Sequence, residues 1–463
     1  MDYNKSTRGV KVFVDRYDEL EILNNEYSKE GLSFSILYGR RRVGKTSLLK
    51  EYIKDKPAIY FLSTMENASI LREKLQFIIA DFFEDNLMKT LIFKDFVGIF
   101  EYIASKEIVK KLVVIIDEFQ YLGKEDSSVP SQFQYIVDET IKSKNIHLVL
   151  CGSIISMMYE QTLSYSSPLY GRRTSSIKLE PIEFCYLNEF FPTHSQEQLL
   201  ELYSIFYGVP KYLEMIEPKK NIFENIKDNI LSPSSYLYNE PQFILQHEVN
   251  EPVTYFSILE IIANGEHKIG NIASRLGKNA NGIMPYLSKL IELDIIYKEV
   301  PITEENPVKS KKGLYFIKDN FFRFWFRYVL PFKSQLEMGN SEYVLHKIKQ
   351  NFNAFVGQSY EKLAVSYVAQ YFNTLKCGRY WNKNIEIDIV GITDSSLIVG
   401  ECKYSNKKVG IDVFDNLKQK AKTIESQLPI KRCILFSKSG FTDELLKMQG
   451  ENLVLIELLS KRI

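Results

Sequence analysis

The segment GRRRVGKT, residues 39–46, constrains the fold of this chain more than any other feature. It follows an apolar run, Phe34 to Tyr38, and opens a stretch that favours a helix. In a phosphate-binding P-loop, a glycine-rich turn directs backbone N–H groups and a helix N-terminus toward phosphate oxygens. Lys45 would reach the outer phosphates, and Thr46 would ligate magnesium. The alternative is a basic turn that merely precedes a helix. The residues predicted to hold the nucleotide here are Gly39, Arg40, Arg41, Arg42, Val43, Gly44, Lys45, Thr46 and Ser47.

A second segment, Leu112 to Asp117, is a run of apolar, mostly β-branched residues that ends in a carboxylate, and Glu118 follows it. The run is typical of a buried strand. Asp117 would hold magnesium, usually through water, and Glu118 would polarise the water that attacks the γ-phosphate. Paired acids at a strand end also cap helices, which is the alternative. Ser153 follows another apolar run and fits either a γ-phosphate sensor or an ordinary turn serine.

Length and composition limit the remaining options. At 463 residues the chain is too long for one core and should divide into about three domains. The formal charge of +1 indicates no global attraction to nucleic acid or membrane, so any such partner must meet a local patch. The N-terminus lacks an apolar signal region, and charged residues interrupt the aromatic stretch at 321–332. We therefore expect a soluble, cytoplasmic protein without membrane contact. Its scattered cysteines, which suit a reducing compartment, are Cys151, Cys185, Cys377, Cys402 and Cys433.

The periodicity of the chain changes several times. Between Phe34 and Leu179, strand-like runs alternate with helical patterns, which predicts a parallel α/β sheet covered by helices. The following stretch is helical and broken by prolines, as in a small lid. We therefore predict an ATPase core over 1–181, a helical lid over 182–248, a winged helix over 249–318, an aromatic connector over 319–350 and a second α/β domain over 351–463.

The predicted winged helix rests on three amphipathic segments, 255–263, 269–276 and 283–293, separated by short turns. Residues 295–300 and 314–317 could then pair as a hairpin, the wing. Its positive charge is modest for a DNA reader, so an internal regulatory or protein-contact role is an equal alternative to DNA binding. The basic residues concerned are Arg275, Lys278, Lys289, Lys309, Lys311 and Lys312.

The C-terminal part carries a second set of charged residues. A long helix over 352–372 should place Glu361 beside its apolar stripe, and two strands over 385–390 and 397–404 should form a hairpin. If Asp394 and Ser395 are the loop residues, Asp388 faces Glu401 on the opposite strand, with side chains about 5 Å apart. Opposed like charges are unfavourable, and a divalent cation between them would remove that penalty.

In the same register Glu386 faces Lys403, and all four side chains would share one face of the sheet. Lys403 could then position or deprotonate an attacking water, which makes the face a candidate hydrolytic metal site for Mg²⁺ or Mn²⁺. The alternative is a solvated hairpin with a Glu386–Lys403 ion pair and two unrelated acids. Because Glu401 ends an apolar run, the site should be half buried, where unpaired acids are costly.

The chain resembles the archaeal-type ATPases of the STAND class of P-loop NTPases over nearly its full length. FVDRYDEL, residues 13–20, resembles the segment of that family that lies near the adenine and adds Arg16 to the nucleotide-binding residues. IIDEFQYL, residues 115–122, resembles its Walker B segment. GVP, residues 208–210, resembles a nucleotide-contacting motif and implies a role for Pro210. PLYGRRT, residues 168–174, resembles an arginine-bearing loop, in which Arg172 is either an arginine finger or a plain charge before a strand.

The C-terminal part resembles the extension usual in that family, a domain similar to PD-(D/E)XK nucleases. This resemblance implies Glu361, Asp388 and Glu401 as metal ligands and Lys403 as a catalytic residue. The predicted function is an ATP- and Mg²⁺-dependent switch coupled to a metal-dependent DNA nuclease-like domain. The alternative is a regulatory ATPase whose C-terminal domain only binds nucleic acid or a protein. ATP and DNA are the predicted partners, and a second copy of the chain is kept as a further candidate.

Overall fold

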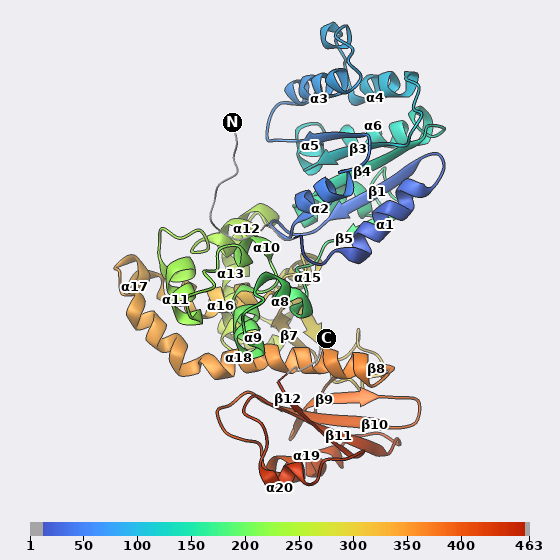
Figure 1. The fold of residues 1–463 in the computed structure, drawn as a ribbon. Coiled ribbons are helices and arrows are strands. Elements are labelled where there is room, and N and C mark those ends of the chain that lie inside the picture. The colour runs from blue at the N-terminus through green and yellow to red at the C-terminus, as the bar shows by residue number, and fades with distance from the viewer. Residues whose placement is uncertain (1–12, 459–463) are drawn as a thin grey trace. The chain divides into compact units, whose positions relative to one another are not determined.

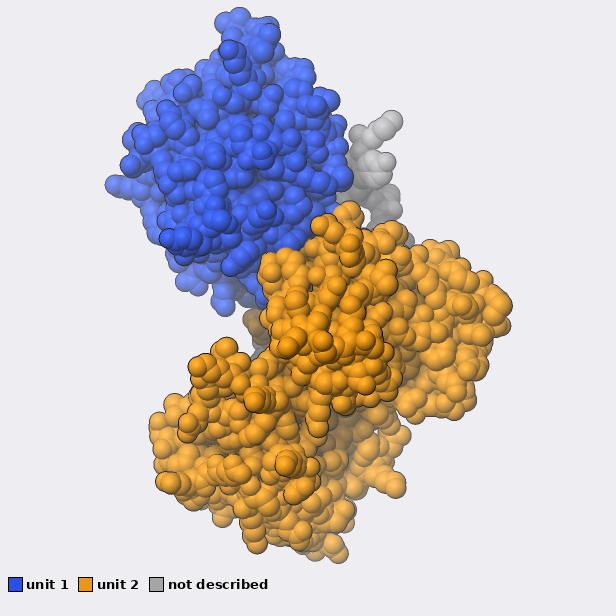
Figure 2. Space-filling view, turned by 180° about the vertical axis from the view of Figure 1, so that it is seen from behind, with its two compact units in different colours: residues 1–182, 209–211 blue, residues 183–208, 212–463 orange. Residues whose placement is uncertain are grey.

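The computed structural model describes residues 13–458, which divide into two compact units. Unit 1 comprises the chain up to residue 182 together with 209–211, and unit 2 comprises 183–208 and the chain from 212 onward (Figure 2). None of the helices in the described part of the chain combines the length and apolar character that crossing a bilayer requires.

Unit 1 is built on a five-stranded sheet, as the alternating pattern predicts. All neighbouring strands in it are parallel, in the order β2-β3-β4-β1-β5. Because β1 and β3 carry their chemistry-bearing residues at their carboxyl ends, the topology brings those residues to one edge. The strands are β1 (Ser33–Tyr38), β2 (Ala58–Leu62), β3 (Leu112–Asp117), β4 (Ile146–Gly152) and β5 (Ser175–Lys178).

Helices cover both faces of this sheet (Figure 1). One core lies on the side of α3 and α4, and a smaller one on the side of α1 and α2. The longer helices are α1 (Tyr17–Ser28), α2 (Lys45–Tyr52), α3 (Ala68–Phe82) and α4 (Phe96–Ser105), and the shorter ones are α5 (Gln120–Glu125), α6 (Val129–Tyr135) and α7 (Ile155–Met158).

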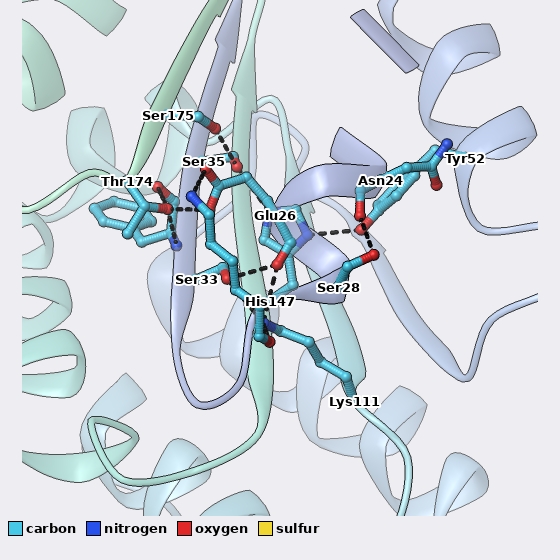
Figure 3. A network of polar contacts seen from close by, with 12 residues as sticks. Asn24, Glu26, Ser28, Ser33, Ser35, Tyr52, Lys111, His147, Thr174 and Ser175 are labelled. Carbon is cyan, nitrogen blue, oxygen red and sulfur yellow. Dashed lines mark hydrogen bonds and ion pairs between the residues drawn. The ribbon is translucent and has the colours of Figure 1, made fainter. Parts of the chain in front are cut away.

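A buried polar network crosses the sheet toward the amino ends of its strands, away from the P-loop that follows the carboxyl end of β1 (Figure 3). His147 on β4 is fully buried, with its Nε2 2.7 Å from Ser35 Oγ on β1 and its Nδ1 2.6 Å from Tyr52 Oη on α2. Ser35 Oγ lies 2.6 Å from Ser175 Oγ on β5. Burial lowers the pKa of His147 to about 3, so the imidazole is neutral. The network joins three strands to the helix that follows the P-loop.

Unit 2 begins with short helices and continues with the three helices and hairpin expected after residue 249. The hairpin pairs β6 with β7 antiparallel. The first helices are α8 (Leu187–Phe190), α9 (Gln196–Phe206), α10 (Pro210–Leu213, which starts within unit 1), α11 (Ile222–Ile226) and α12 (Glu240–Glu248). The later elements are α13 (Pro252–Ala263), α14 (Ile269–Arg275), α15 (Ala280–Glu292), β6 (Ile296–Glu299) and β7 (Leu314–Ile317).

The aromatic segment after β7 is helical. The long helix predicted from residue 352 is α18, which starts eleven residues earlier, at Ser341. Helix α18 runs along a second five-stranded sheet of mixed direction, ordered β12-β11-β10-β9-β8 (Figure 1). The helices are α16 (Asn320–Tyr328), α17 (Lys333–Glu337), α18 (Ser341–Tyr371), α19 (Ile411–Ala421) and α20 (Asp443–Leu446). The strands are β8 (Lys376–Trp381), β9 (Glu386–Ile392), β10 (Leu397–Lys403), β11 (Ile430–Ser437) and β12 (Leu453–Glu457).

The hairpin register predicted for β9 and β10 is confirmed from Ile392–Leu397 to Ile389–Gly400. The backbone pairing stops beyond that pair. There the Cys402 N–H donates to a side chain, Asp388 Oδ2, at 2.9 Å and not to a backbone carbonyl of β9. The paired register therefore does not extend to the predicted opposition of Glu386 and Lys403. Glu386 ion-pairs with Arg379, and Lys403 ion-pairs with Glu401.

Candidate nucleotide site and C-terminal cleft

The backbone of the P-loop requires its glycines at two positions. Gly39 and Gly44 have φ of +153° and +99°, conformations that L side chains rarely adopt. A Cβ at Gly39 would collide with the Leu179 carbonyl oxygen, whereas one at Gly44 would meet Pro210 Cγ at 3.8 Å. Pro210 therefore lies against the P-loop, near the nucleotide site as its motif implies.

Lys45, at the start of α2, is 6% exposed. Its Nζ donates to the Gly39 carbonyl oxygen at 2.7 Å and to that of Arg40 at 2.9 Å. Burial lowers the pKa of Lys45, and the carboxylates of Asp117 and Glu118 oppose that shift. A buried ammonium held only by neutral carbonyls fits a phosphate, which would supply the missing negative charge.

The two acids at the carboxyl end of β3 are held differently. Asp117 is 1% exposed, and its Oδ2 accepts bonds from Thr46 Oγ1 at 3.0 Å and from the Tyr60 hydroxyl. Glu118 has φ of +56°, and its Oε2 accepts bonds from Ser153 Oγ at 2.6 Å and from Gln120 Nε2. Such backbone conformations concentrate at functional sites. A carboxylate beside a threonine hydroxyl fits magnesium, because both supply the oxygen ligands that this ion prefers.

Two predicted arginines have internal partners. Arg16, at φ +77° and 4% exposed, donates from NH2 to the carbonyl oxygens of Val43 at 3.0 Å and Glu180 at 2.7 Å, so it braces the P-loop backbone. Arg172 ion-pairs with Asp138 at 2.8 Å and donates to the Pro168 carbonyl oxygen at 2.6 Å. The structure therefore holds the Arg172 guanidinium against its own unit.

Sequence reasoning missed the phenols of this site. Tyr60 on β2 bonds Asp117, and Tyr121 accepts a bond from Arg41 NH2 at 2.7 Å. Tyr121 belongs to the Walker B segment, so the motif itself could have placed this residue near the site. The position of Tyr60 could not be predicted in this way, because it depends on β2 lying next to β3, which is a property of the strand order.

In unit 2 the structure brings Glu361 and Asp388 near one another. Burial raises the pKa of both carboxyls. The charge of Asp388 adds to the shift at Glu361, and the charge of Glu401 adds to that at Asp388. These acids disfavour their own ionisation, which is the condition that a bound cation would relieve.

Glu401 itself is satisfied by lysines. Its Oε1 accepts Lys403 Nζ at 2.8 Å and Lys420 Nζ, from α19, at 3.3 Å. Across residues 13–458, no group of three or more His, Cys, Asp or Glu side chains is placed to hold a metal ion. The predicted three-carboxylate metal site is therefore not assembled, because two ammonium groups neutralise Glu401 in place of a cation. Lys420 carried no sequence signal.

A cavity of about 730 Å³ opens beside these acids, and β6, β7, α16, α18, β9 and β10 all contribute to it. Arg379 spans one side, ion-pairing with Glu299 of β6 at 3.2 Å and with Glu386 of β9. The residues that line the cavity include Glu361, Asp388 and Lys403 but not Glu401. We call this cavity the C-terminal cleft.

The basic residues expected to contact DNA from the three-helix segment are partly neutralised. Arg275 ion-pairs with Glu266 at 3.0 Å, and Lys289 with Glu292 at 2.9 Å. In the loop between β6 and β7, Lys312 ion-pairs with Glu304 at 2.7 Å. Exposed pairs of this kind are weak, but they reduce the positive field of the segment.

A P-loop, a strand ending in paired acids and a parallel sheet define unit 1 as a P-loop ATPase domain. Residues 13–216 match the family described as an ATPase domain predominantly from Archaea, and residues 325–421 match a family of archaeal and bacterial proteins of unknown function. The chain is 38% identical over 393 residues to the uncharacterized protein MJECL04 of Methanocaldococcus jannaschii, covering 83% of this chain and 85% of that protein. The chain belongs to this family of archaeal-type ATPases.

Solved structures with related folds include the Walker-type ATPase PABY2304 of Pyrococcus abyssi, at 21% identity and a TM-score of 0.49, covering 70% of this chain and 99% of that one. The ORC2 protein of Aeropyrum pernix, in ADPNP-ADP complexes, has 15% identity and a TM-score of 0.48, covering 73% and 98%.

Proposed function

We propose that the chain is an ATP-binding and ATP-hydrolysing switch whose C-terminal cleft acts on DNA. The observation that carries the ATPase part is the placement of Lys45, Thr46 and the two acids Asp117 and Glu118 around one strand edge. Lys45 and the P-loop amides would hold the phosphates of ATP, and Thr46 and Asp117 would hold Mg²⁺.

Bound Mg²⁺ supplies charge neutralisation on the transferred phosphoryl group. Glu118 is the candidate to orient and deprotonate water, since its carboxylate is already aimed by Ser153 and Gln120. Arg16 and Pro210 fix the P-loop from behind and are expected to affect nucleotide affinity more than the rate of hydrolysis.

For the cleft we propose metal-dependent cleavage of DNA. Mg²⁺ is commonly bound by one or two carboxylates together with substrate phosphates, so Glu361 and Asp388 could suffice once a phosphodiester is present. Glu401 would join when Lys403 turns from it toward the attacking water. The raised pKa values of the two carboxyls support this proposal, because burial and the neighbouring acids outweigh the opposing charges of Arg379 and Lys403.

The test uses the full chain with supercoiled plasmid and either Mg²⁺ or Mn²⁺. Cleavage that requires the metal and disappears in Asp388→Asn supports the nuclease. Equal nicking by wild type and Asp388→Asn, or none by wild type, contradicts it. ATP turnover measured on the same preparations tests the ATPase part separately.

A second candidate function is favoured by the two lysines on Glu401. With Lys403 and Lys420 bound there, the C-terminal domain already has its charge balanced without a metal. It would then bind nucleic acid or a protein partner without cutting, and ATP hydrolysis would time that binding. Calorimetric binding of Mg²⁺ or Mn²⁺ to the wild type that is lost in Asp388→Asn would exclude this alternative.

A further inference from the structure

Within the described part of the chain, two cations of the C-terminal cleft, Arg323 and Lys362, have no ion-pair partner. Arg323 of α16 is 6% exposed and donates to Gln358 Oε1 at 2.6 Å, Ser359 Oγ at 2.9 Å and the Phe355 carbonyl oxygen at 3.2 Å. All three acceptors are neutral, and its buried Nε has no hydrogen-bond partner among the described residues.

Lys362 of α18 is the second cation. Its Nζ lies 3.4 Å from the Ile317 carbonyl oxygen and 4.9 Å from the centroid of the Tyr297 ring. The nearby carboxylates of Glu299 and Glu361 attract it but form no ion pair with it. Within residues 13–458 the other basic groups of the cleft are paired, Arg379 with Glu299 and Glu386, and Lys403 with Glu401.

A buried guanidinium and a half-buried ammonium that lack ion-pair partners are costly, and an anion between them would remove that cost. A built anion subsite therefore lies beside the acids Glu361 and Asp388, in the same cleft. Placed next to a candidate metal-binding pair, such a subsite suits a phosphodiester.

Aromatic rings line the cleft as well, and one of them, Tyr297, is the ring that lies beside Lys362. His267 stacks on Phe316 with ring centroids 4.2 Å apart and an interplanar angle of 30°, and Tyr297 stacks on Phe316 at 5.6 Å and 26°. All three rings line the cleft and are only partly buried. A row of stacked rings beside cationic groups is the arrangement that binds unpaired bases, since every base has a π-face.

The geometry points to a binding site for single-stranded DNA in the C-terminal cleft. Arg323 and Lys362 would hold a backbone phosphate, and a base would stack at the end of the row of rings that Phe316 holds together with His267 and Tyr297. This inference rests on the proposed nucleic-acid-acting function of the cleft. A cavity of about 730 Å³ has the size of a pocket for one small molecule and cannot enclose a duplex, so unpaired or flipped-out nucleotides are the expected ligand.

The test measures fluorescence anisotropy of a labelled single-stranded oligothymidylate and of a duplex of equal length with the full chain. EDTA is present, so that neither cleavage nor ATP hydrolysis contributes. Lys362→Gln should weaken binding of the single strand about tenfold and reduce its salt slope by about 0.7. The matched control Lys347→Gln removes a half-buried lysine of the same helix that does not line the cleft, and it should change neither.

Phe316→Leu keeps an apolar side chain but removes the ring. It should weaken binding of the single strand about tenfold without changing the affinity for the duplex. The control Tyr343→Leu removes an exposed ring of α18. Thermal melting of all four variants checks that they fold.

The inference is overturned if Lys362→Gln binds like Lys347→Gln, if the duplex binds as tightly as the single strand, or if the wild type binds neither. Metal-dependent plasmid cleavage that persists in Lys362→Gln would leave the proposed nuclease standing while this site fails. A wild type that does not hydrolyse ATP would instead contradict the ATPase proposal, and the anisotropy test of this site would still stand.

Discussion

The chain contains two pairs of acids, one at the carboxyl end of β3 in unit 1 and one on the neighbouring strands β9 and β10 in unit 2, and their surroundings differ. Asp117 and Glu118 accept bonds from neutral hydroxyl and amide donors. Asp388 lies close to Glu361 and to Glu401, and two lysines ion-pair with Glu401. Neutral donors can be exchanged for a metal ion at little electrostatic cost, whereas lysines must be displaced. We therefore expect the first pair to be preorganised for Mg²⁺, and the second to need its substrate to complete a metal site.

The largest effect should come from a substitution of Lys45, which should change the nucleotide chemistry of unit 1 and leave unit 2 unaffected. Lys45→Ala removes the buried ammonium and should weaken ATP binding and reduce hydrolysis by about 10²–10³-fold. The fold should persist, since the lysine bonds only loop carbonyls. DNA binding without nucleotide should not change. Equal ATP turnover by the variant would contradict the assignment.

Glu118→Gln should lower hydrolysis by about 10²–10⁴-fold, because a general base is removed, while ATP still binds. Asp117 and Thr46 remain to hold the metal. Equilibrium binding of a fluorescent ATP analogue, compared with turnover, measures the two effects. A variant that loses binding along with hydrolysis would break the division of roles between the two acids.

The second pair is tested by changing charge without shape. Asp388→Asn should reduce metal-dependent cleavage to background, yet the melting temperature without metal should not fall, because a like-charge repulsion is removed.

Lys403→Ala should lower cleavage about 10²-fold while metal affinity stays largely intact. A loss of metal binding measured by calorimetry would show that this lysine acts on the ion site rather than on the water.

The smallest effect concerns the pH dependence of stability. The pKa of His147 is about 3 in the folded state and 6.5 when exposed, so the unfolded chain takes up the proton first as pH falls. The contribution of neutral His147 to the free energy of unfolding of unit 1 should be present above pH 6.5. About 2 kcal/mol of it should be lost by pH 5. In unit 2, burial followed by the charge of Glu197 raises the pKa of Glu201 to about 7, so protonation there favours the fold as pH falls.

The two units can be followed separately. Both tryptophans, Trp325 and Trp381, lie in unit 2, so their fluorescence reports on that unit, while hydrogen exchange of β1 and β4 amides reports on unit 1. Exchange in β1 should accelerate between pH 6.5 and 5 beyond its intrinsic rate. His147→Gln should abolish that extra dependence, whatever its effect on absolute stability. A slope unchanged by the substitution would remove His147 as its source.

Local sequence was sufficient for every feature that depends on neighbours in the chain. The P-loop, the strand before it and the helix after it are adjacent in sequence, so the motif predicts its own geometry. The β9–β10 register was likewise predictable, because a short turn determines which residues oppose one another. The ladder nevertheless stopped one pair before Asp388 and Glu401, since a side chain took the Cys402 N–H.

What the sequence determined by itself is the nucleotide chemistry: glycines where φ is positive, a lysine and threonine at the helix start, and acids at the end of an apolar strand. Only the tertiary structure decided which charges meet. Lys420 reaches Glu401 from α19, Arg379 joins Glu299 to Glu386, and Arg323 and Lys362 come together from separate helices. Periodicity shows which face of an element is apolar, but it does not show which other element that face meets.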